Sequence, residues 1–434
     1  MIQYRPEARE TQPVEAPMRD PIYKSRPVEP NAARYGGERI NDFIVMSEGF
    51  SNCYLIETDA GNIQINAGMA LEAPVHQSNF EAFSIAPLSA LILTQGHVDH
   101  VGGVQYFRDQ HSGLQVLATA ANTEHQAYDK RLQAFRGGRS AFAFTDKFAA
   151  VIDYYQQHDY RNYPEQDDPV PDVLFEGSHT LEIGGLELQL IAVPGAETND
   201  SLIVWLPQHK ICFTGNLFGC PFGHFPNLVT IRGDRYRDAL TVAAAVKTVM
   251  DLGAQTIIYG HHAPIEGAAI IEDELRALHT AILYVHDETV AGMNAGTDVH
   301  TLMAQIQLPP EMEVGQGYGK VSWSVRAIWE HYAGWFHHQS TTELYSVPQK
   351  SVHADLLELA GGAKVLVERA EIKYTQAQFE QALHLLDIVL SVESDHPGAV
   401  SLALKVHRSL ADQSENFWLS SWLSNQQAVL ASRL

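Results

Sequence analysis

Metal-ligand side chains are concentrated in one short stretch, Thr94-Gln95-Gly96-His97-Val98-Asp99-His100-Val101-Gly102-Gly103. His97, Asp99 and His100 offer two imidazoles and one carboxylate within four residues, and these groups bind Zn2+ in proteins. The stretch directly follows the apolar run 90–93, which indicates a buried strand that ends in a loop. Loops at strand ends often display binding groups. The pattern therefore predicts a metal-binding loop at the end of a core strand.

Further candidate ligands follow other predicted strands. Glu197 lies in the turn 194–201, Asn216 comes shortly after the apolar segment 210–213, and His261 follows the predicted strand 256–259. Taken in order, these motifs resemble the metallo-β-lactamase superfamily, whose signature is His-x-His-x-Asp-His-x-Gly-Gly. They resemble its alkyl sulfatase (type III sulfatase) branch most, because that branch carries a glutamate at the position of Glu197, where β-lactamases carry a histidine.

At three positions the chain has a neutral amide where the family pattern has a histidine or an acidic residue. The first histidine of the signature is Gln95, the acidic residue of an earlier supporting loop is Asn66, and the metal-bridging carboxylate is Asn216. A neutral amide does not supply the charge that holds two divalent cations close together. We therefore expect one site to be bound more tightly than the other.

The resemblance implies which residues form each metal site. We expect one tightly bound Zn2+ at Asp99, His100 and His261, because two imidazoles and a carboxylate leave a fourth position open for water. The second site, where occupancy stays uncertain, has weaker ligands: His97 and Glu197 with Gln95 and Asn216. Another divalent metal in place of zinc stays open. Cys220 is interpreted as a packing residue rather than as a thiolate ligand.

A loop that follows Asn216 carries candidate substrate-binding residues. The run His224, Asn227, Thr230, Ile231, Arg232, Gly233, Arg237 and Asp238 resembles an alkyl sulfatase segment that lies near the sulfate. The resemblance implies that Asn227, Thr230 and Arg232 clamp the anion. Arg232 suits this role because a planar guanidinium can hold two oxygens of a tetrahedral anion. His262 is a further candidate that faces the substrate or supports a metal ligand.

Short apolar runs and turns predict the elements that position these residues. We expect strands at 42–56, 62–65, 90–93, 114–118, 180–183, 186–193, 201–206, 210–213 and 256–259, with helices at 74–83, 104–110 and 238–252. Beyond about residue 268 the pattern is helical with few breaks. The resemblance implies an α/β fold, namely a metallo-β-lactamase αββα sandwich followed by an all-α dimerisation and tetratricopeptide-like domain. We expect no counterpart of the sterol-carrier-like third domain that is common in secreted alkyl sulfatases.

Three domains follow from these patterns: an extended N-terminal arm at 1–37, a catalytic domain at 38–268 and a helical domain at 269–434. The segment 123–165 is an insertion relative to small β-lactamases. It resembles the alkyl sulfatase insert that roofs the active site, and the sequence leaves open whether it is such a lid or a packed surface excursion. His125 within it is interpreted as structural.

Composition limits the partners. A net charge of -23 argues against nucleic acid or an anionic membrane as a partner, and no apolar segment approaches membrane-spanning length. The first 37 residues lack the apolar core of a secretory signal, so we expect a cytoplasmic protein. The segments 272–293 and 324–336 resemble the alkyl sulfatase dimerisation region, which implies a homodimer.

The resemblance implies a metal-dependent hydrolase that cleaves a small ester, here a sulfate ester, with metal-bound hydroxide as the nucleophile. Asp99 would be a metal ligand and candidate base, and Arg232 would bind the anion. Two alternatives stay open: a lactonase, carboxylic ester or phosphoester hydrolase on the same fold, and a decayed pseudoenzyme or binding protein. The amides at 66, 95 and 216 favour decay, whereas the remaining ligands suffice for at least one metal.

Overall fold

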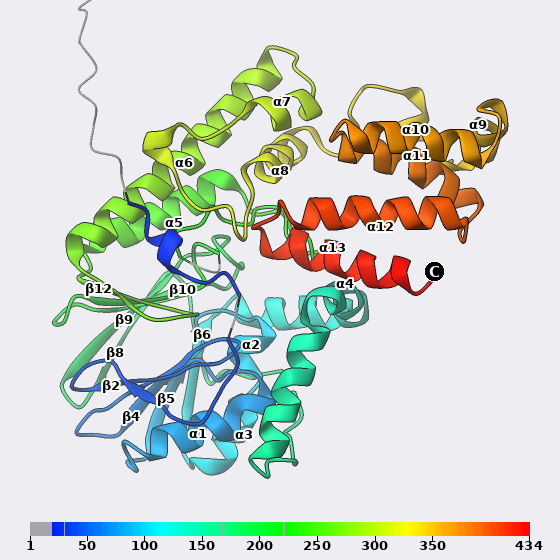
Figure 1. Cartoon of the computed structure of the whole chain (residues 1–434). Coiled ribbons are helices and arrows are strands. Elements are labelled where there is room, and N and C mark those ends of the chain that lie inside the picture. Colours follow the sequence, from blue (N-terminus) through cyan, green and yellow to red (C-terminus); the bar gives the residue numbers. More distant parts are fainter. Residues whose placement is uncertain (1–19, 30, 167, 220–221) are drawn as a thin grey trace, which may run out of the picture.

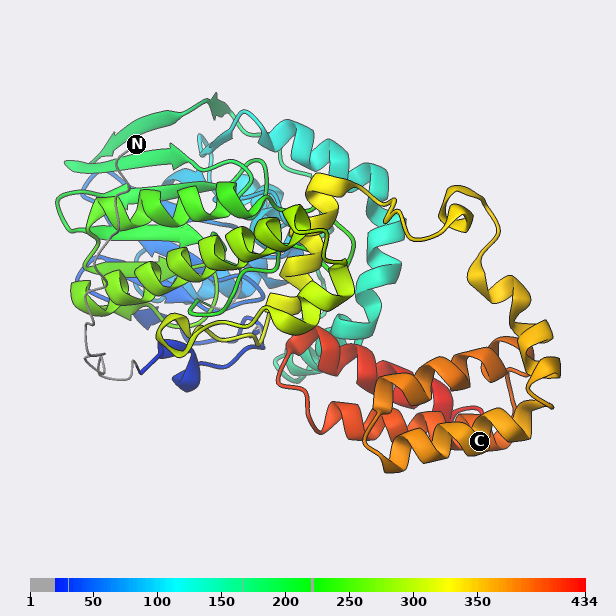
Figure 2. The same ribbon diagram turned by 90° about the horizontal axis from the view of Figure 1, so that it is seen from above.

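The structure is a computed structural model that describes residues 20–29, 31–166, 168–219 and 222–434. Cys220 and most of the predicted N-terminal arm lie outside the described residues. Two β-sheets packed face to face form one half of the molecule, and helices cover both outer faces (Figure 1). A group of helices from the C-terminal third lies beside this sandwich (Figure 2). The sandwich followed by helices confirms the predicted fold class.

The first sheet contains seven strands in chain order: β1 (Glu38–Arg39), β2 (Ile44–Ser47), β3 (Cys53–Ile56), β4 (Asn62–Ile65), β5 (Leu88–Ile92), β6 (Gln115–Thr119) and β7 (Val173–Phe175). The pairs from β1 to β4 are antiparallel, whereas β4 to β7 run parallel. Because parallel strands end at the same edge of a sheet, the loops after β4, β5 and β6 lie together.

The second sheet contains six strands in the order β13 (Ile265–Glu266), β12 (Thr256–Tyr259), β11 (Ile211–Gly215), β10 (Leu202–Leu206), β9 (Leu186–Ala192) and β8 (Ser178–Ile183). Only β11 and β12 pair in parallel within it. Apolar side chains from both inner faces fill the space between the sheets, among them Ile44, Ile56, Ile92, Leu190 and Phe213. The predicted strand 42–56 is two strands, β2 and β3, and β1, β7 and β13 were not predicted. The ends of the other predicted strands lie within two residues of those observed.

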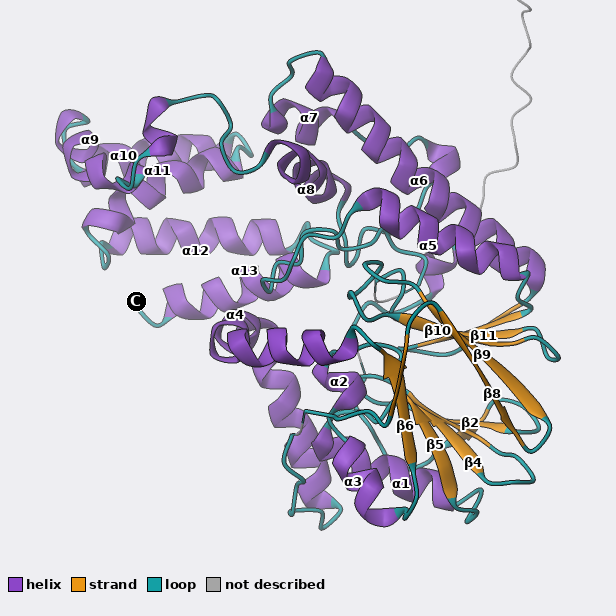
Figure 3. Cartoon of the chain, turned by 180° about the vertical axis from the view of Figure 1, so that it is seen from behind, coloured by secondary structure: helices purple, strands orange, loops and turns teal. Residues whose placement is uncertain are grey.

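Helices cover the outer faces of both sheets (Figure 3). The first sheet is covered by α1 (Ala73–Glu81), α2 (Val98–Val101) and α3 (Val104–Gln110), and the second by α5 (Ala239–Leu252) and α6 (Ala268–Asn294). The α5 helix illustrates why these boundaries arise. The Asp238 side chain accepts the N–H of Thr241 at its start, and Gly253, with a φ of 62°, ends it in the left-handed region.

The predicted insertion is a single helix, α4 (Asn122–Gln157), of 36 residues. At 1.5 Å per residue it is about 54 Å long. It runs along the side of the sandwich as far as the C-terminal helices (Figures 1 and 3). Its last turns pack through Val151 and Tyr155 against Phe50 and Val75. The insertion thus connects the sandwich with the helical part.

The C-terminal part contains α7 (Val299–Gln305), α8 (Val321–Ala333), α9 (His353–Leu359), α10 (Ala363–Thr375), α11 (Phe379–Val392), α12 (Pro397–Ala411) and α13 (Phe417–Ala431). The expectation of few breaks was wrong at 306–320 and 334–352, which hold only short 3-10 helices. Pro309, Pro310 and Pro348 explain part of this, because proline disfavours helix in the preceding residue. In the described part of the chain, no helix is long and apolar enough to cross a bilayer. The cytoplasmic location stays a prediction.

The hydrophobic core crosses the predicted domain boundary at 268. Residues of α6 and α8, such as Leu278 and Val325, share one core with α5 and the second sheet. A separate core is formed by α9 to α13 around Leu386, Val400 and Val406. The division at 268 stays a prediction, and the packing joins the first helices after it to the sandwich.

Aromatic side chains join α13 to α4. Trp418 is fully buried, and its ring centroid lies 6.1 Å from that of Phe142, 5.8 Å from that of Phe144 and 5.7 Å from that of Tyr318. Trp422 lies one turn further along α13 and is 47% exposed. Its ring centroid lies 5.4 Å from that of Phe142. Trp418 is thus the fully buried part of an aromatic contact between the long helix and α13, and Trp422 is the half-exposed part.

We expect Trp418→Ala to lower the free energy of unfolding by about 3–5 kcal/mol, because a large buried side chain is removed and a cavity remains. Trp422→Ala is the matched control and should cost roughly 1 kcal/mol or less, since half of that side chain is in water. Denaturant unfolding followed by circular dichroism compares the two. Equal losses of stability would contradict the packing described here.

Candidate metal centre

The loop after β5 and the loop after β12 meet at one edge of the sandwich. Asp99 and His100 lie on the short helix α2, and His261 follows β12 by two residues. The two sheets are joined at this point, because the N–H of Asn52 donates to the Gly260 oxygen over 2.7 Å and the Tyr54 hydroxyl donates to the Tyr259 oxygen. Residues far apart in sequence are thereby held on a common rigid support.

Asp99, His100 and His261 each offer a ligand atom, and these three atoms lie within 4.8 Å of one another. The Asp99 Oδ2 atom is 3.6 Å from His100 Nε2 and 4.0 Å from His261 Nε2. Within the described residues, no other group of three His, Cys, Asp or Glu ligand atoms comes this close together. The structure therefore assembles the three residues that we predicted for the tightly bound metal.

The surroundings of His100 fit a metal ligand. Its Nε2 atom is buried and has no hydrogen-bond partner among the described residues, although buried polar atoms rarely lack one. Its other ring nitrogen, Nδ1, lies 3.0 Å from the Ser51 hydroxyl, which fixes the orientation of the ring. A metal-binding histidine commonly uses its second nitrogen in this way.

Protonation also fits this role. Burial lowers the pKa of His100 and of His261 to about 3, so both imidazoles are neutral at pH 7 and keep a free lone pair. Burial raises the pKa of Asp99, and the neighbouring His261 and Arg232 oppose this rise. Two neutral nitrogens and one carboxylate are a donor set that zinc accepts, with one position left for water or substrate.

Three side chains of the predicted second set, His97, Gln95 and Glu197, make other contacts, whereas the buried Asn216 Oδ1 atom has no hydrogen-bond partner among the described residues. Arg232 Nη2 lies 3.0 Å from His97 Nε2, and the Gln95 side-chain amide lies 2.8 Å from His97 Nδ1. The Glu197 carboxylate accepts from Arg237 Nη2 over 2.8 Å. The four residues do lie side by side, since Glu197 Oε1 is 3.9 Å from His97 Nδ1 and Asn216 N is 3.4 Å from Gln95 Oε1. As they stand, His97 and Glu197 direct their ligand atoms toward arginines.

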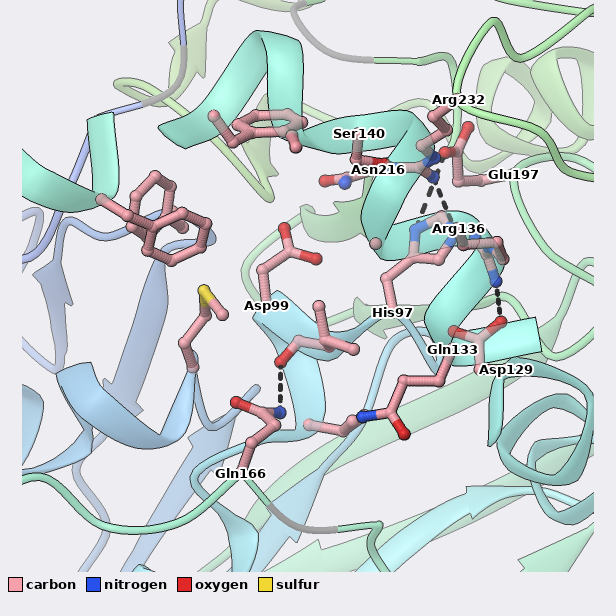
Figure 4. A pocket seen from close by; sticks show the side chains of 18 of the residues that line it. His97, Asp99, Asp129, Gln133, Arg136, Ser140, Gln166, Glu197, Asn216 and Arg232 are labelled. Atoms are coloured by element: carbon pink, nitrogen blue, oxygen red, sulfur yellow. Dashed lines mark hydrogen bonds and ion pairs between the residues drawn. The ribbon is translucent and has the colours of Figure 1, made fainter. Parts of the chain in front are cut away.

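A cavity of about 500 Å³ opens over both sets. Polar residues in its wall include His97, Asp99, Glu197, Arg232 and His261. Figure 4 shows Arg232, Asn216 and Glu197 next to His97, with a dashed line from Arg232 to His97, and Asp99 pointing into the space beside them. Apolar side chains complete the wall: Phe50, Met69, Val98, Phe144, Phe148 and Phe417. The cavity thus combines charged groups with an apolar surface.

One face of α4 lines this cavity. Most lining positions have another lining position three or four residues away, which is the spacing of one helix face: 126, 129, 130, 133, 136, 137, 140, 141, 144, 145 and 148. We did not predict Arg136, Asp129 or Tyr318 as cavity residues. The helical spacing of 126–148 was the available signal for the first two, whereas nothing local marks Tyr318. The arrangement favours the lid alternative for the insertion.

The predicted substrate-binding residues are not all in the cavity. Arg232 lines it, but Asn227, Thr230 and His262 do not. Arg237 Nη1 donates to the Asn227 backbone oxygen, and Thr230 and His262 have φ values of 45° and 62°. All three residues are buried, and their substrate-binding role stays a prediction.

Two family models match two separate parts of the chain. The family model "Metallo-beta-lactamase superfamily" matches residues 46–261, and the model "Alkyl sulfatase dimerisation" matches residues 298–431. Residues 46–261 therefore form a domain of the metallo-β-lactamase superfamily. Residues 298–431 match the dimerisation domain of the alkyl sulfatases, in agreement with the motifs of the sequence.

Individual relatives agree with this assignment. A linear primary-alkylsulfatase from a Pseudomonas species is 25% identical over 401 residues, which cover 88% of this chain and 74% of the relative. An (R)-specific secondary-alkylsulfatase from Pseudomonas is 23% identical over 397 residues, covering 86% of this chain but only 59% of the relative. The solved structure of a stereoselective inverting sec-alkylsulfatase from Pseudomonas has a TM-score of 0.77 at 19% identity, covering 91% of this chain and 66% of that one. This likeness shows the fold.

We expect purified protein to retain one divalent metal per chain after gentle chelation. His100→Ala should abolish this retention, and Ser51→Ala should weaken metal affinity by about 10- to 100-fold, because the partner that orients the His100 ring is lost. Elemental analysis and metal titration measure both effects. His125→Ala is the control, since this buried histidine lies near the cavity but outside the three-residue group. Loss of metal from the His125 variant alone would contradict the assignment.

Proposed function

We propose that the chain is a metal-dependent hydrolase that cleaves sulfate monoesters of apolar alcohols. The observation that carries this proposal is the shared cavity, whose wall includes Asp99 and His261 of the three-residue group together with Arg232. The alkylsulfatases that the chain resembles support the same chemistry. The proposed metal is zinc, and the proposed ligands are these three residues.

Zinc bound by three protein ligands lowers the pKa of a water molecule to about 7, which supplies a nucleophile at neutral pH. The chain's own groups would bind and orient the ester. Burial opposes the charge of Arg232, but Tyr318, Glu197 and Asp234 raise its pKa above the ordinary value. A permanently charged, planar guanidinium can hold two sulfate oxygens at once and neutralise charge that develops on them.

The apolar wall would bind the alcohol part of the ester. Phe50, Phe144 and Phe148 exclude water from the space beside the charged groups. Excluding water strengthens electrostatic interactions within the cavity. Asp99, whose pKa is raised by burial, can accept a proton at a carboxylate oxygen close to the reacting atoms.

The alternatives use the same cavity differently. A phosphoester would also bind Arg232, whereas a neutral lactone or carboxylic ester would not need its charge. The pseudoenzyme alternative is supported by the amides at 66, 95 and 216. It is opposed by the unpartnered His100 Nε2 atom, which a decayed site would have no reason to keep buried and free.

We expect Arg232→Ala to raise KM for an alkyl sulfate by about 10- to 100-fold, because charge-assisted hydrogen bonds to the sulfate are worth about 1.5–3 kcal/mol. Metal content should stay at one per chain. Steady-state kinetics and elemental analysis measure the two effects. Arg235→Ala, an exposed arginine of the same loop, is the control. A neutral lactone as best substrate, together with no effect of Arg232→Ala on it, would reject sulfate ester hydrolysis and leave the fold unaffected.

We also propose that the chain forms a homodimer through its C-terminal half. Large apolar side chains are exposed there, including Trp335 (70%), Tyr345 (69%) and Leu359 (83%). Aromatic anchors of this kind are common in interface cores. The dimerisation domain that matches 298–431 supports the same conclusion.

Light scattering should give about twice the chain mass of 48.1 kDa. The double variant Trp335→Asp, Tyr345→Asp should shift the mass toward the monomer, because burying two carboxylates in an interface is unfavourable. Ile85→Asp is the control, since this side chain is 92% exposed on the sandwich. A monomer mass for the unmodified protein at working concentration would reject the dimer.

A further inference from the structure

We propose that the guanidinium of Arg232 takes the place of the second metal ion, so that the site works with one metal and one built-in organic cation. This inference rests on the proposed function and specifies which groups supply the positive charge in the cavity. It concerns the position beside His97, Glu197, Gln95 and Asn216, where the family pattern implies a second metal.

The contact between Arg232 and His97 is the first argument. Arg232 Nη2 lies 3.0 Å from His97 Nε2. A guanidinium nitrogen can only donate, so the Nε2 lone pair is the acceptor in this contact. The other ring nitrogen, Nδ1, lies 2.8 Å from Gln95 Nε2, so neither nitrogen of His97 is without a polar neighbour. The lone pair that a metal would need is thus already used by the arginine.

The charge of Glu197 is the second argument. Arg237 Nη2 donates to the Glu197 carboxylate over 2.8 Å, and Arg237 Nε donates to the Glu197 backbone oxygen over 2.7 Å. Both side chains are less than a tenth exposed, so the pair is a permanent part of the interior. The only acidic residue of the predicted second set is therefore already neutralised.

The two amides are the third argument. Gln95 and Asn216 are buried and carry no charge, so they cannot offset a divalent cation. A metal ion at this position would face Arg232 and Arg237, and the one carboxylate of the predicted second set, Glu197, is already paired. The residues present do not fit a second metal, whereas they fit a single positive charge that donates hydrogen bonds.

An acidic side chain lies beside the contact between Arg232 and His97. Asp234 Oδ2 lies 3.8 Å from His97 Nε2, close to the Arg232 contact, and it also accepts from Arg136 Nη2 over 3.2 Å. Because a covalently attached cation cannot dissociate, the cavity keeps this charge under conditions that strip metals. The remaining donors of the guanidinium stay available for the anionic end of the substrate.

The test is metal stoichiometry in the full chain, measured by elemental analysis after gel filtration from excess Zn2+. Three proteins are compared: the unmodified chain, the double variant Gln95→His, Asn216→Asp, and the triple variant that adds Arg232→Ala. We expect one metal per chain in the first two and two metals per chain in the third. The double variant regains the ligand types of the family pattern but keeps the arginine, so the difference isolates the guanidinium.

A spectroscopic measurement checks the same point. Titration with Co2+ should give visible absorption that saturates at one equivalent in the unmodified chain and in the double variant, and at two equivalents in the triple variant. Adding Arg235→Ala to the double variant, in place of Arg232→Ala, should leave saturation at one equivalent. This control removes a positive charge from the same loop without freeing His97.

Two metals in the unmodified chain, or a single metal in the triple variant, would overturn the inference. The measurement on the unmodified chain does not depend on whether any variant folds. Two bound metals together with sulfate ester hydrolysis would overturn this inference and leave the proposed function standing. A chain that binds no metal at all would overturn both.

Discussion

Charge that is removed from water must be matched by opposite charge, and this requirement governs the cavity. Glu197 is paired with Arg237, Asp129 and Asp234 with Arg136, and Asp168 with Lys130. Among the described residues around the cavity, Asp99 is the carboxylate that no arginine or lysine contacts as an ion pair, since its close partners are the neutral imidazoles of His100 and His261. The carboxylate without a cationic side-chain partner therefore belongs to the three-residue ligand group, where a metal ion would supply the positive charge.

This pairing of charges depends on α4, the helix that forms most of the predicted insertion. The α4 helix supplies Asp129, Lys130 and Arg136, and its middle part packs through Phe142 and Phe144 against Trp418. The C-terminal helices therefore support the cavity wall without contributing a proposed metal ligand. Loosening of that contact would disturb the electrostatics of the site from a distance.

The sequence predicted the parts of the site that local pattern determines. The strand before residue 94, the glycines after His100 and the order of later motifs were enough to bring Asp99, His100 and His261 together. Pairing between distant charges left no such local signal. Nothing beside Glu197 indicates that Arg237 neutralises it, and nothing near His97 indicates that Arg232 takes up its lone pair. Asn227, Thr230 and His262 stay predicted substrate-binding residues, because the described cavity wall includes only Arg232 of that set.

Gly137 and Gly138 lie in the middle of α4, and a Cβ atom built at either position meets no atom within 4 Å. Two glycines in a helix interior cost about 2 kcal/mol relative to alanine, so this helix gives up stability where packing does not require it to. Gly137 borders the cavity. A side chain there would project toward substrate rather than into the backbone. A single substitution at Gly137 would therefore make the cavity shallower without replacing Arg232 or a proposed metal ligand.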